Sequence, residues 1–96
     1  MFTEIVTFPL KGGATREEVL EKYKGSVEIW EQNPDLIRKY YLFDPVKLIG
    51  GGVYLWKEKG NAEKWHGDAF KERIKTTYNS LPKCEIFETP IVVDNS

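Results

Sequence analysis

The stretch LIRKYYLFDPVKLIGGGVYLWK, residues 36–57, contains two runs of apolar and aromatic residues separated by Asp44-Pro45. Each run has the length and composition of a β-strand, and an Asp-Pro pair is typical of a turn. The pattern predicts two strands, Leu36–Phe43 and Leu48–Lys57, which pair as a hairpin in the middle of the chain. The segments on either side of this hairpin decide the fold.

The segment before the hairpin predicts a strand followed by a helix. Phe2–Leu10 is rich in β-branched and aromatic residues and is followed by two glycines. Thr15 and Glu18 have the spacing of a capping box, in which their side chains bond to free backbone N–H groups at the start of a helix. Apolar residues then recur every three or four positions as far as Asn33-Pro34, where proline disfavours helical geometry.

The segment after the hairpin predicts a second helix and a last strand. Asn61 is a suitable helix cap, and Leu81-Pro82 ends the helical region. One broad face of this helix comprises Ala62, Trp65, His66, Ala69, Phe70, Arg73, Ile74 and Thr77. Cys84–Asp94 then predicts a strand that must be broken, bulged or at a sheet edge at Pro90, because proline cannot donate a ladder hydrogen bond.

The element order β-α-β-β-α-β predicts a single domain over residues 1–96 of the α+β class. We expect the ferredoxin-like arrangement, an antiparallel four-stranded sheet with two helices on one face. In strand 36–43, however, apolar residues occupy both faces: Ile37 and Tyr41 lie on one, Tyr40 and Leu42 on the other. A sheet face in contact with water is normally polar. The pattern therefore predicts a homodimer in which the uncovered sheet faces stack.

Charge and composition argue against several classes of function. Fourteen Lys and Arg residues, dispersed along the chain, balance fifteen Asp and Glu residues, so we expect no nucleic-acid partner. No apolar run is long enough to cross a bilayer, and no secretion signal is recognised, so we expect no membrane partner and a cytoplasmic location. Cys84 is the only cysteine and His66 the only histidine, so we expect neither a disulfide nor a metal site, and we interpret Cys84 as an ordinary strand residue.

Thirteen aromatic residues in so short a chain must fill a core or surround a cavity for a flat ligand. The candidate pocket residues are Trp30, Tyr40, Tyr54, Trp56, Trp65 and Phe70. Histidine exchanges protons readily near neutral pH, so His66 is the candidate general acid or base, although a satisfied structural histidine is the alternative. Gly50-Gly51-Gly52 precedes a strand, so it is no phosphate loop; it predicts a bulge, a tight hairpin end, or close approach of a ligand.

Gly51-Gly52-Val53-Tyr54-Leu55-Trp56, followed by a helix that carries His66, resembles the signature of the dimeric α+β-barrel, antibiotic-biosynthesis-monooxygenase-like proteins, and of the YdhR-like subgroup in particular. The resemblance implies that Trp56 and His66 face a cavity between sheet and helices. Members that oxidise polycyclic phenols use no flavin or metal; the deprotonated substrate itself donates an electron to dioxygen. By this analogy His66 acts as base or as hydrogen-bond donor to an enolate and Tyr54 holds a phenolic oxygen. The residues that would stack on the substrate rings are Trp30, Trp56 and Trp65.

Two functions from different classes follow. The first is a cofactor-independent monooxygenase that acts on a flat aromatic or quinone-like molecule, with His66 and Tyr54 as catalytic residues. The second is a non-catalytic, small-ligand-binding or stress-associated dimer. Haem degradation is disfavoured, because members with that activity use an Asn on the first strand, where this chain offers Thr3 and Thr7. A purely structural oligomer would have its cavity filled by aromatic side chains.

Overall fold

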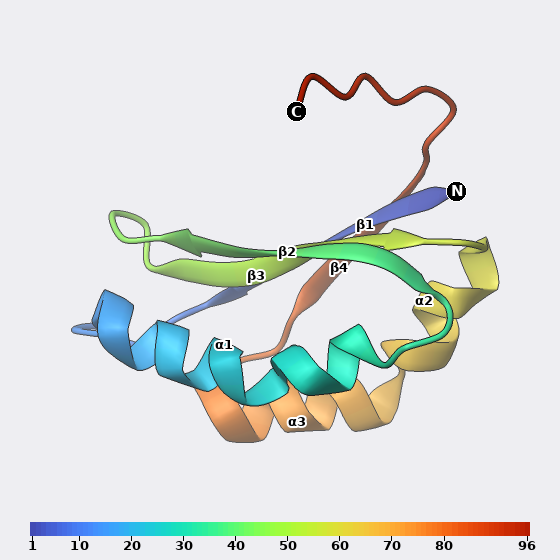
Figure 1. Cartoon of the computed structure of the whole chain (residues 1–96). Helices are drawn as coiled ribbons and strands as arrows, with labels where there is room; N and C mark the ends of the chain where they lie inside the picture. Colours follow the sequence, from blue (N-terminus) through green and yellow to red (C-terminus); the bar gives the residue numbers. More distant parts are fainter.

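The computed structural model describes all 96 residues and contains one four-stranded antiparallel sheet with helices on a single face (Figure 1). The elements in chain order are β1 (Phe2–Pro9), α1 (Arg16–Glu31), β2 (Leu36–Asp44), β3 (Ile49–Trp56), α2 (Lys59–Trp65), α3 (Asp68–Tyr78) and β4 (Lys83–Glu88). The strands lie in the order β2-β3-β1-β4, and every neighbouring pair is antiparallel. The predicted ferredoxin-like α+β fold is confirmed.

Local sequence signals explain where α1 begins and how the hairpin turns. Thr15 is the N-cap of α1, and its hydroxyl accepts a hydrogen bond from the Glu18 N–H, so the Thr part of the predicted capping box is present. In the hairpin turn, Asp44 Oδ1 accepts from the N–H groups of Val46 and Lys47 at 2.9 and 3.0 Å. This Asx-type turn pairs β2 with β3 as predicted.

The predicted second helix is divided in two, which corrects the expectation of two helices. His66 leaves helical geometry, with φ −113° and ψ 38°, and Gly67 becomes the N-cap of α3. Glycine is a poor helix former, so a break at this position costs little. The expected cap is also corrected: Glu58 is the N-cap of α2, and Asn61, three residues later, accepts a hydrogen bond from the Glu58 N–H at 2.8 Å. The break turns His66 towards the sheet.

An irregularity at Ile37 sets which residues of β2 face the helices. Leu36 pairs with Trp56, whereas Arg38 pairs with the adjacent residue, Leu55, so the strand gains one residue at Ile37. Beyond this bulge every second residue, beginning with Lys39, faces the helices. The predicted placing of Ile37 on the same face as Tyr41 is therefore wrong, and the Ile37 side chain is 50% exposed.

The three consecutive glycines lie within β3 in regular register with β1, so the predicted bulge or hairpin end is wrong. A Cβ on Gly51 would lie 1.9 Å from the Val6 carbonyl oxygen, and one on Gly50 would lie 2.6 Å from the Tyr23 hydroxyl. Their missing side chains let β1 and a tyrosine of α1 approach the β3 backbone closely. The Gly51 N–H then donates a hydrogen bond to Tyr23 Oη at 3.0 Å.

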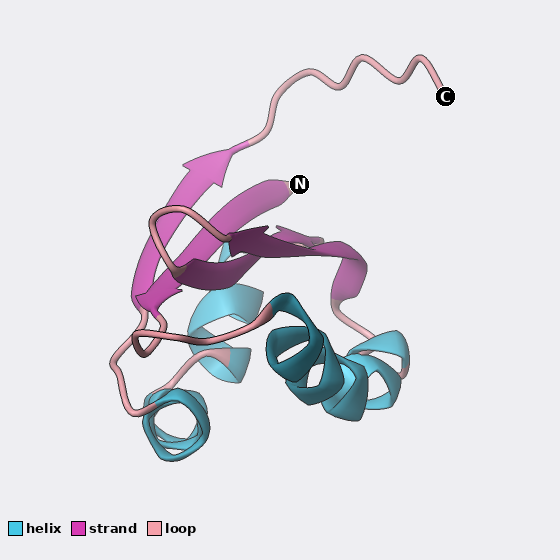
Figure 2. Ribbon diagram, turned by 90° about the vertical axis from the view of Figure 1, so that its left-hand side faces the viewer, coloured by secondary structure: helices cyan, strands magenta, loops and turns pink.

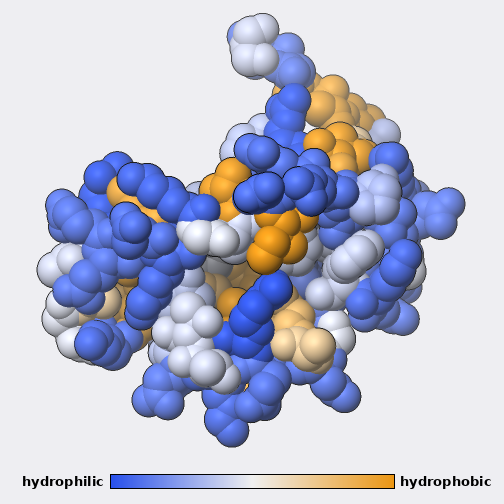
Figure 3. Space-filling view, turned by 60° about the horizontal axis from the view of Figure 1, so that its bottom comes forward, coloured by the Kyte–Doolittle hydropathy of each residue, from blue (hydrophilic) through white to orange (hydrophobic).

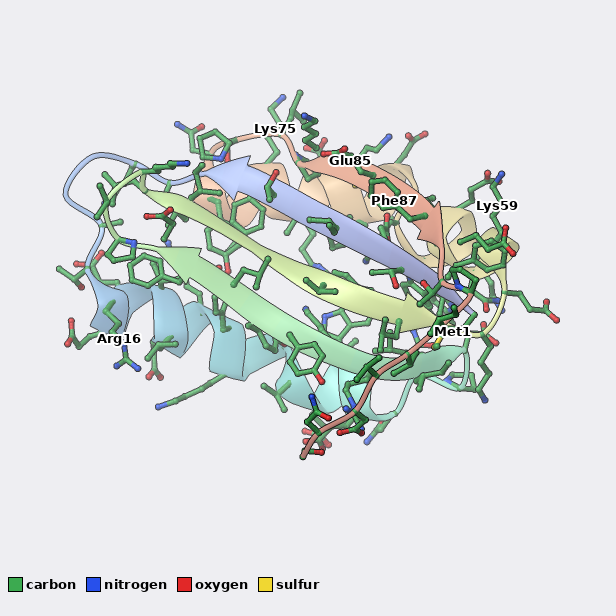
Figure 4. The ribbon with its side chains drawn as sticks, turned by 90° about the horizontal axis from the view of Figure 1, so that it is seen from above. Met1, Arg16, Lys59, Lys75, Glu85 and Phe87 are labelled. Atoms are coloured by element: carbon green, nitrogen blue, oxygen red, sulfur yellow. The ribbon has the colours of Figure 1, made fainter.

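The two faces of the sheet have different surroundings. All three helices lie against one face, as the side view in Figure 2 shows. No helix covers the other face, which is turned to the viewer in Figure 4 and carries Phe87 of β4. Its apolar members include Tyr40, which is 49% exposed, and Phe87, which is 50% exposed. The predicted stacking of two copies on this face stays a prediction.

The last strand is shorter than predicted. β4 ends at Glu88 rather than Asp94, and residues 89–96 form no further strand, which agrees with the interruption expected at Pro90. This tail extends past the sheet on the side away from the helices (Figure 1). None of the three helices combines the length and the apolar composition that crossing a bilayer requires.

Candidate functional site

A cavity of about 280 Å³ lies between the sheet and the helices α1 and α3. Its lining residues come from five elements: β1, β2, β3, α1 and α3. Aromatic rings form much of the wall, among them Trp30, Tyr41, Tyr54 and Phe70. In the space-filling view towards the helices, apolar residues gather between hydrophilic flanks (Figure 3). A concave, mainly apolar site of this kind is typical of small-molecule binding.

Tyr54 supplies the cavity with a free hydroxyl. It follows the glycines on β3, faces the helices and is 3% exposed, with its ring 5.2 Å from that of Trp30. Its hydroxyl makes no hydrogen bond within the protein, and burial raises its pKa far above the ordinary value for tyrosine. The group therefore stays protonated and is available to donate a hydrogen bond to a ligand oxygen.

Two other tyrosines of the wall are already engaged. Tyr23 Oη donates to the Leu42 carbonyl at 2.7 Å and accepts from the Gly51 N–H. Tyr41 Oη shares a hydrogen bond of 2.7 Å with Ser26 Oγ of α1. These bonds hold α1 on the sheet, so we assign Tyr23 and Tyr41 to the architecture of the cavity.

The charged groups of the lining are cationic. Lys39 of β2 points inward, and its Nζ lies 3.9 Å from the ring centroid of Tyr41 and 4.6 Å from that of Tyr54. Burial, with the nearby Arg73 guanidinium, lowers the pKa of Lys39 to about 7. Arg73 of α3 lies over the rings of Trp30 and Phe70, at 5.8 and 5.6 Å. Ring faces attract cations, so these contacts orient both side chains.

A buried polar cluster lies outside the lining of the cavity. Glu4 of β1 is 1% exposed, and its Oε1 accepts from Trp56 Nε1 at 3.0 Å and lies 2.5 Å from His66 Nδ1. His66 packs between Tyr54 and Phe70, with ring centroids 4.3 and 4.0 Å away. Its Nε2 is buried and has no hydrogen-bond partner. The cluster thus supports two walls of the cavity from outside the lining.

The structure divides the predicted site residues into four groups. Trp30, Tyr54 and Phe70 line the cavity, whereas Trp56 and His66 do not and pack against Tyr54. Trp65, also outside the lining, donates from Nε1 to Asp35 Oδ2 at 2.9 Å. Tyr40 is corrected: it faces away from the cavity on the uncovered side of the sheet, where Arg38 donates to its hydroxyl. The bulge at Ile37 sets this orientation.

Three polar residues of this region, Glu4, Lys39 and Arg73, are not among the site residues predicted from the sequence. Glu4 alternates with the buried Val6 and Phe8 on β1, so a charged residue on an apolar face was the available signal. Lys39 likewise shares a face of its strand with Tyr41. The bulge at Ile37 changes which face this is, so strand alternation alone does not show that Lys39 points inward. Arg73 was predicted only as a member of a helix face. Such residues are recognised as part of the site region by the burial of their side chains and not by their residue type.

The remaining candidates for site chemistry are possible metal ligands and the single thiol, that of Cys84. No group of three or more His, Cys, Asp and Glu side chains is placed to hold a metal ion, and Glu4 with His66 is only a pair. Burial raises the pKa of the Cys84 thiol to about 11, so the thiol is protonated at neutral pH. Cys84 is half-buried and packs against the core, which agrees with its interpretation as a strand residue.

Solved structures share this architecture, although no family model and no curated protein matches the chain. A protein of unknown function from Nitrosomonas europaea superposes with a TM-score of 0.74 at 13% identity, over 99% of this chain and 94% of that one. A monooxygenase from Streptomyces coelicolor, in complex with nanaomycin D, gives 0.68 at 19% identity, over 99% and 92%. The fold is that of the antibiotic-biosynthesis-monooxygenase-like proteins. SnoaB, a cofactor-independent oxygenase from Streptomyces nogalater with this monooxygenase-like fold, gives 0.68 at 12% identity, over 96% and 95%.

The shared fold does not by itself give this chain a ligand or a reaction, because one fold hosts many reactions. At identities below 20% the chemistry must come from this chain's own side chains. Those are the aromatic wall, the free Tyr54 hydroxyl, and the cations Lys39 and Arg73.

Proposed function

We propose that this protein is a small oxygenase that binds a flat aromatic or quinone-like molecule and oxidises it with dioxygen, without flavin or metal. The observation that carries the proposal is the aromatic cavity into which Tyr54 presents an unpaired, protonated hydroxyl. The likeness to a monooxygenase in complex with nanaomycin D and to a cofactor-independent oxygenase supports the choice of reaction class. The cavity volume of about 280 Å³ is near the lower end of the range typical of small-molecule pockets.

Each site residue has a role in this proposal. Trp30 and Phe70 contact the faces or edges of the substrate rings. Tyr54 donates a hydrogen bond to the substrate oxygen on which negative charge develops, and such a donor stabilises an oxyanion. His66 and Trp56, which pack against Tyr54, are positioning residues that hold its ring in place. We further propose that two copies pair through the uncovered sheet faces.

Oxygen consumption with a panel of anthrones and hydroquinones tests the proposal. Tyr54→Phe removes one hydroxyl and keeps the ring, so uptake should fall by roughly a hundredfold, the effect of removing an oxyanion hydrogen bond. Tyr40→Phe is the matched control, because its hydroxyl lies on the opposite face of the sheet. Binding of these compounds without oxygen uptake by the unmodified protein would instead support the non-catalytic ligand-binding function.

A further inference from the structure

The cavity has an unbalanced charge. Its lining contains three cationic side chains, Lys22, Lys39 and Arg73, and no Asp, Glu or His. The chain as a whole carries a net charge of −1, so this excess is a local property of the cavity. Lys22 Nζ is engaged with the Thr77 carbonyl at 3.3 Å, whereas Lys39 and Arg73 form no ion pair. A ligand that carries or acquires negative charge would restore the balance.

Lys39 has the surroundings of a reactive amine rather than of a surface lysine. Its Nζ is enclosed by the rings of Tyr41, Tyr54 and Trp30, with centroids 3.9, 4.6 and 4.7 Å away. Cation–π contacts of this kind stabilise an ammonium group less than an anionic partner in a dry site would. With burial and the charge of Arg73 both opposing the ammonium form, the pKa of Lys39 falls to about 7.

The titratable and charged groups that surround Lys39 are Tyr41 on β2, Tyr54 on β3 and Arg73 on α3. Burial raises the pKa of both tyrosines, so neither takes a proton from a ligand at neutral pH. Arginine stays protonated in proteins and cannot act as a base. The amine of Lys39 is therefore the group of this set with a lone pair available for a proton.

We propose that Lys39 is the proton acceptor of the cavity for the O–H group of a phenolic or enolic substrate. The substrate O–H bond breaks, its proton passes to Lys39 Nζ, and the electron pair stays on oxygen as a phenolate or enolate. The new ammonium group and Arg73 then balance the anion, while Tyr54 donates a hydrogen bond to it. This inference rests on the proposed function, since an electron-rich anion is the species that donates an electron to dioxygen there.

The location of His66 favours Lys39 over the base predicted from sequence. His66 Nδ1 is engaged with Glu4, and its Nε2 is buried and outside the lining of the cavity. A general base must lie within hydrogen-bond reach of the proton that it removes. Lys39 is in the lining, where a bound ligand can come within this reach.

Binding of 2-naphthol at a pH of about 8 tests the assignment, because this phenol and the amine of Lys39 are then both mostly neutral before they meet. The bound naphthol should show the absorption spectrum of its anion. Because the proton stays on Lys39, none should be released to the solvent, so calorimetry in two buffers of different ionisation enthalpy should give the same binding enthalpy. In Lys39→Arg, any anion that binds should release one proton per ligand to the buffer.

Several outcomes would overturn the assignment: no binding of 2-naphthol at millimolar concentration, binding of its neutral form, or release of one proton by the unmodified protein. Lys24→Arg, an exposed lysine of α1 outside the lining, is the matched control and should behave like the parent. Retention of oxygen uptake in Lys39→Arg would overturn the Lys39 assignment and leave the proposed function intact. Transfer of the naphthol proton to Lys39, with no oxygen uptake by the unmodified protein on any substrate of the panel, would leave the Lys39 assignment intact and overturn the proposed function.

Discussion

Glu4 Oε1 lies 2.5 Å from His66 Nδ1, although 62 residues separate them in the sequence. Both side chains are shielded from solvent, and Trp56 donates to the same oxygen atom. One carboxyl group thus joins β1, the end of β3 and the junction between α2 and α3. This junction is the point at which the helix breaks. The break therefore places His66 where its side chain can hydrogen-bond to Glu4.

Replacing Glu4 with an apolar residue should destabilise the fold. Glu4→Met leaves His66 Nδ1 and Trp56 Nε1 buried without an acceptor, which should lower the free energy of unfolding by about 2–5 kcal/mol. Urea unfolding followed by tryptophan fluorescence measures the change. Glu85→Met on β4, where the carboxylate is half exposed, should change it by less than about 0.5 kcal/mol. Equal midpoints for the two variants would contradict this role for Glu4.

Gly51 should tolerate no side chain. In Gly51→Ala the new Cβ would lie 1.9 Å from the Val6 carbonyl oxygen, so β1 and β3 must separate. We expect the melting temperature to fall by more than about 10 °C, which corresponds to roughly 2 kcal/mol in a domain of this size. Gly60→Ala in α2 meets no atom within 4 Å and should leave it unchanged or slightly raised. Calorimetric melting compares them, and similar temperatures would count against the close approach.

Lys39 should make stability depend on pH. Its pKa falls from 10.5 in the unfolded chain to about 7 in the folded protein, so between these values the unfolded state binds more protons. The free energy of unfolding should therefore rise above pH 7, with a slope of up to about 1.4 kcal/mol per pH unit. Above pH 9 the raised pKa of Cys84, about 11, acts in the opposite direction, because the unfolded thiol loses its proton first.

Urea midpoints measured between about pH 6 and pH 9 check this dependence. Lys39→Met has no ammonium group to bury, so it should be more stable than the parent at pH 6 and should lack the rise. Lys24→Met, at an exposed position of α1, should keep it. A parent protein whose stability is flat over this range would show that Lys39 is better solvated than its burial implies.

The uncovered sheet face should hold two copies together. Val53→Asp places a charge on this face between Ile5 and Tyr40, its partners on β1 and β2. Burying an unpaired charge there is strongly unfavourable, so the variant should be monomeric or unfolded. Light scattering after size exclusion gives the mass. Leu81→Asp is the control, since this leucine is 66% exposed between α3 and β4. A monomeric parent, or a dimer unaffected by Val53→Asp, would refute pairing through this face.

Much of the fold was predictable because its signals are local. Thr15 caps α1, Asp44 turns the hairpin, and β4 ends before Pro90, each through interactions within a few residues of the chain. Tyr54 and Trp56 share a face because side chains alternate along any strand. Their inward direction, however, depended on how β3 pairs with its neighbours.

The sequence by itself determined the order and class of the elements, the shared face of Tyr54 and Trp56, and the wealth of aromatic side chains near them. Only the tertiary structure decided that Glu4 meets His66, that Lys39 enters the cavity and that Tyr40 turns away from it. The physical reason is that periodicity reports which residues share a face, whereas a single-residue bulge at Ile37 or a helix break at Gly67 redirects everything that follows. Such irregularities are stabilised by contacts between residues far apart in the chain, and these contacts leave no local pattern.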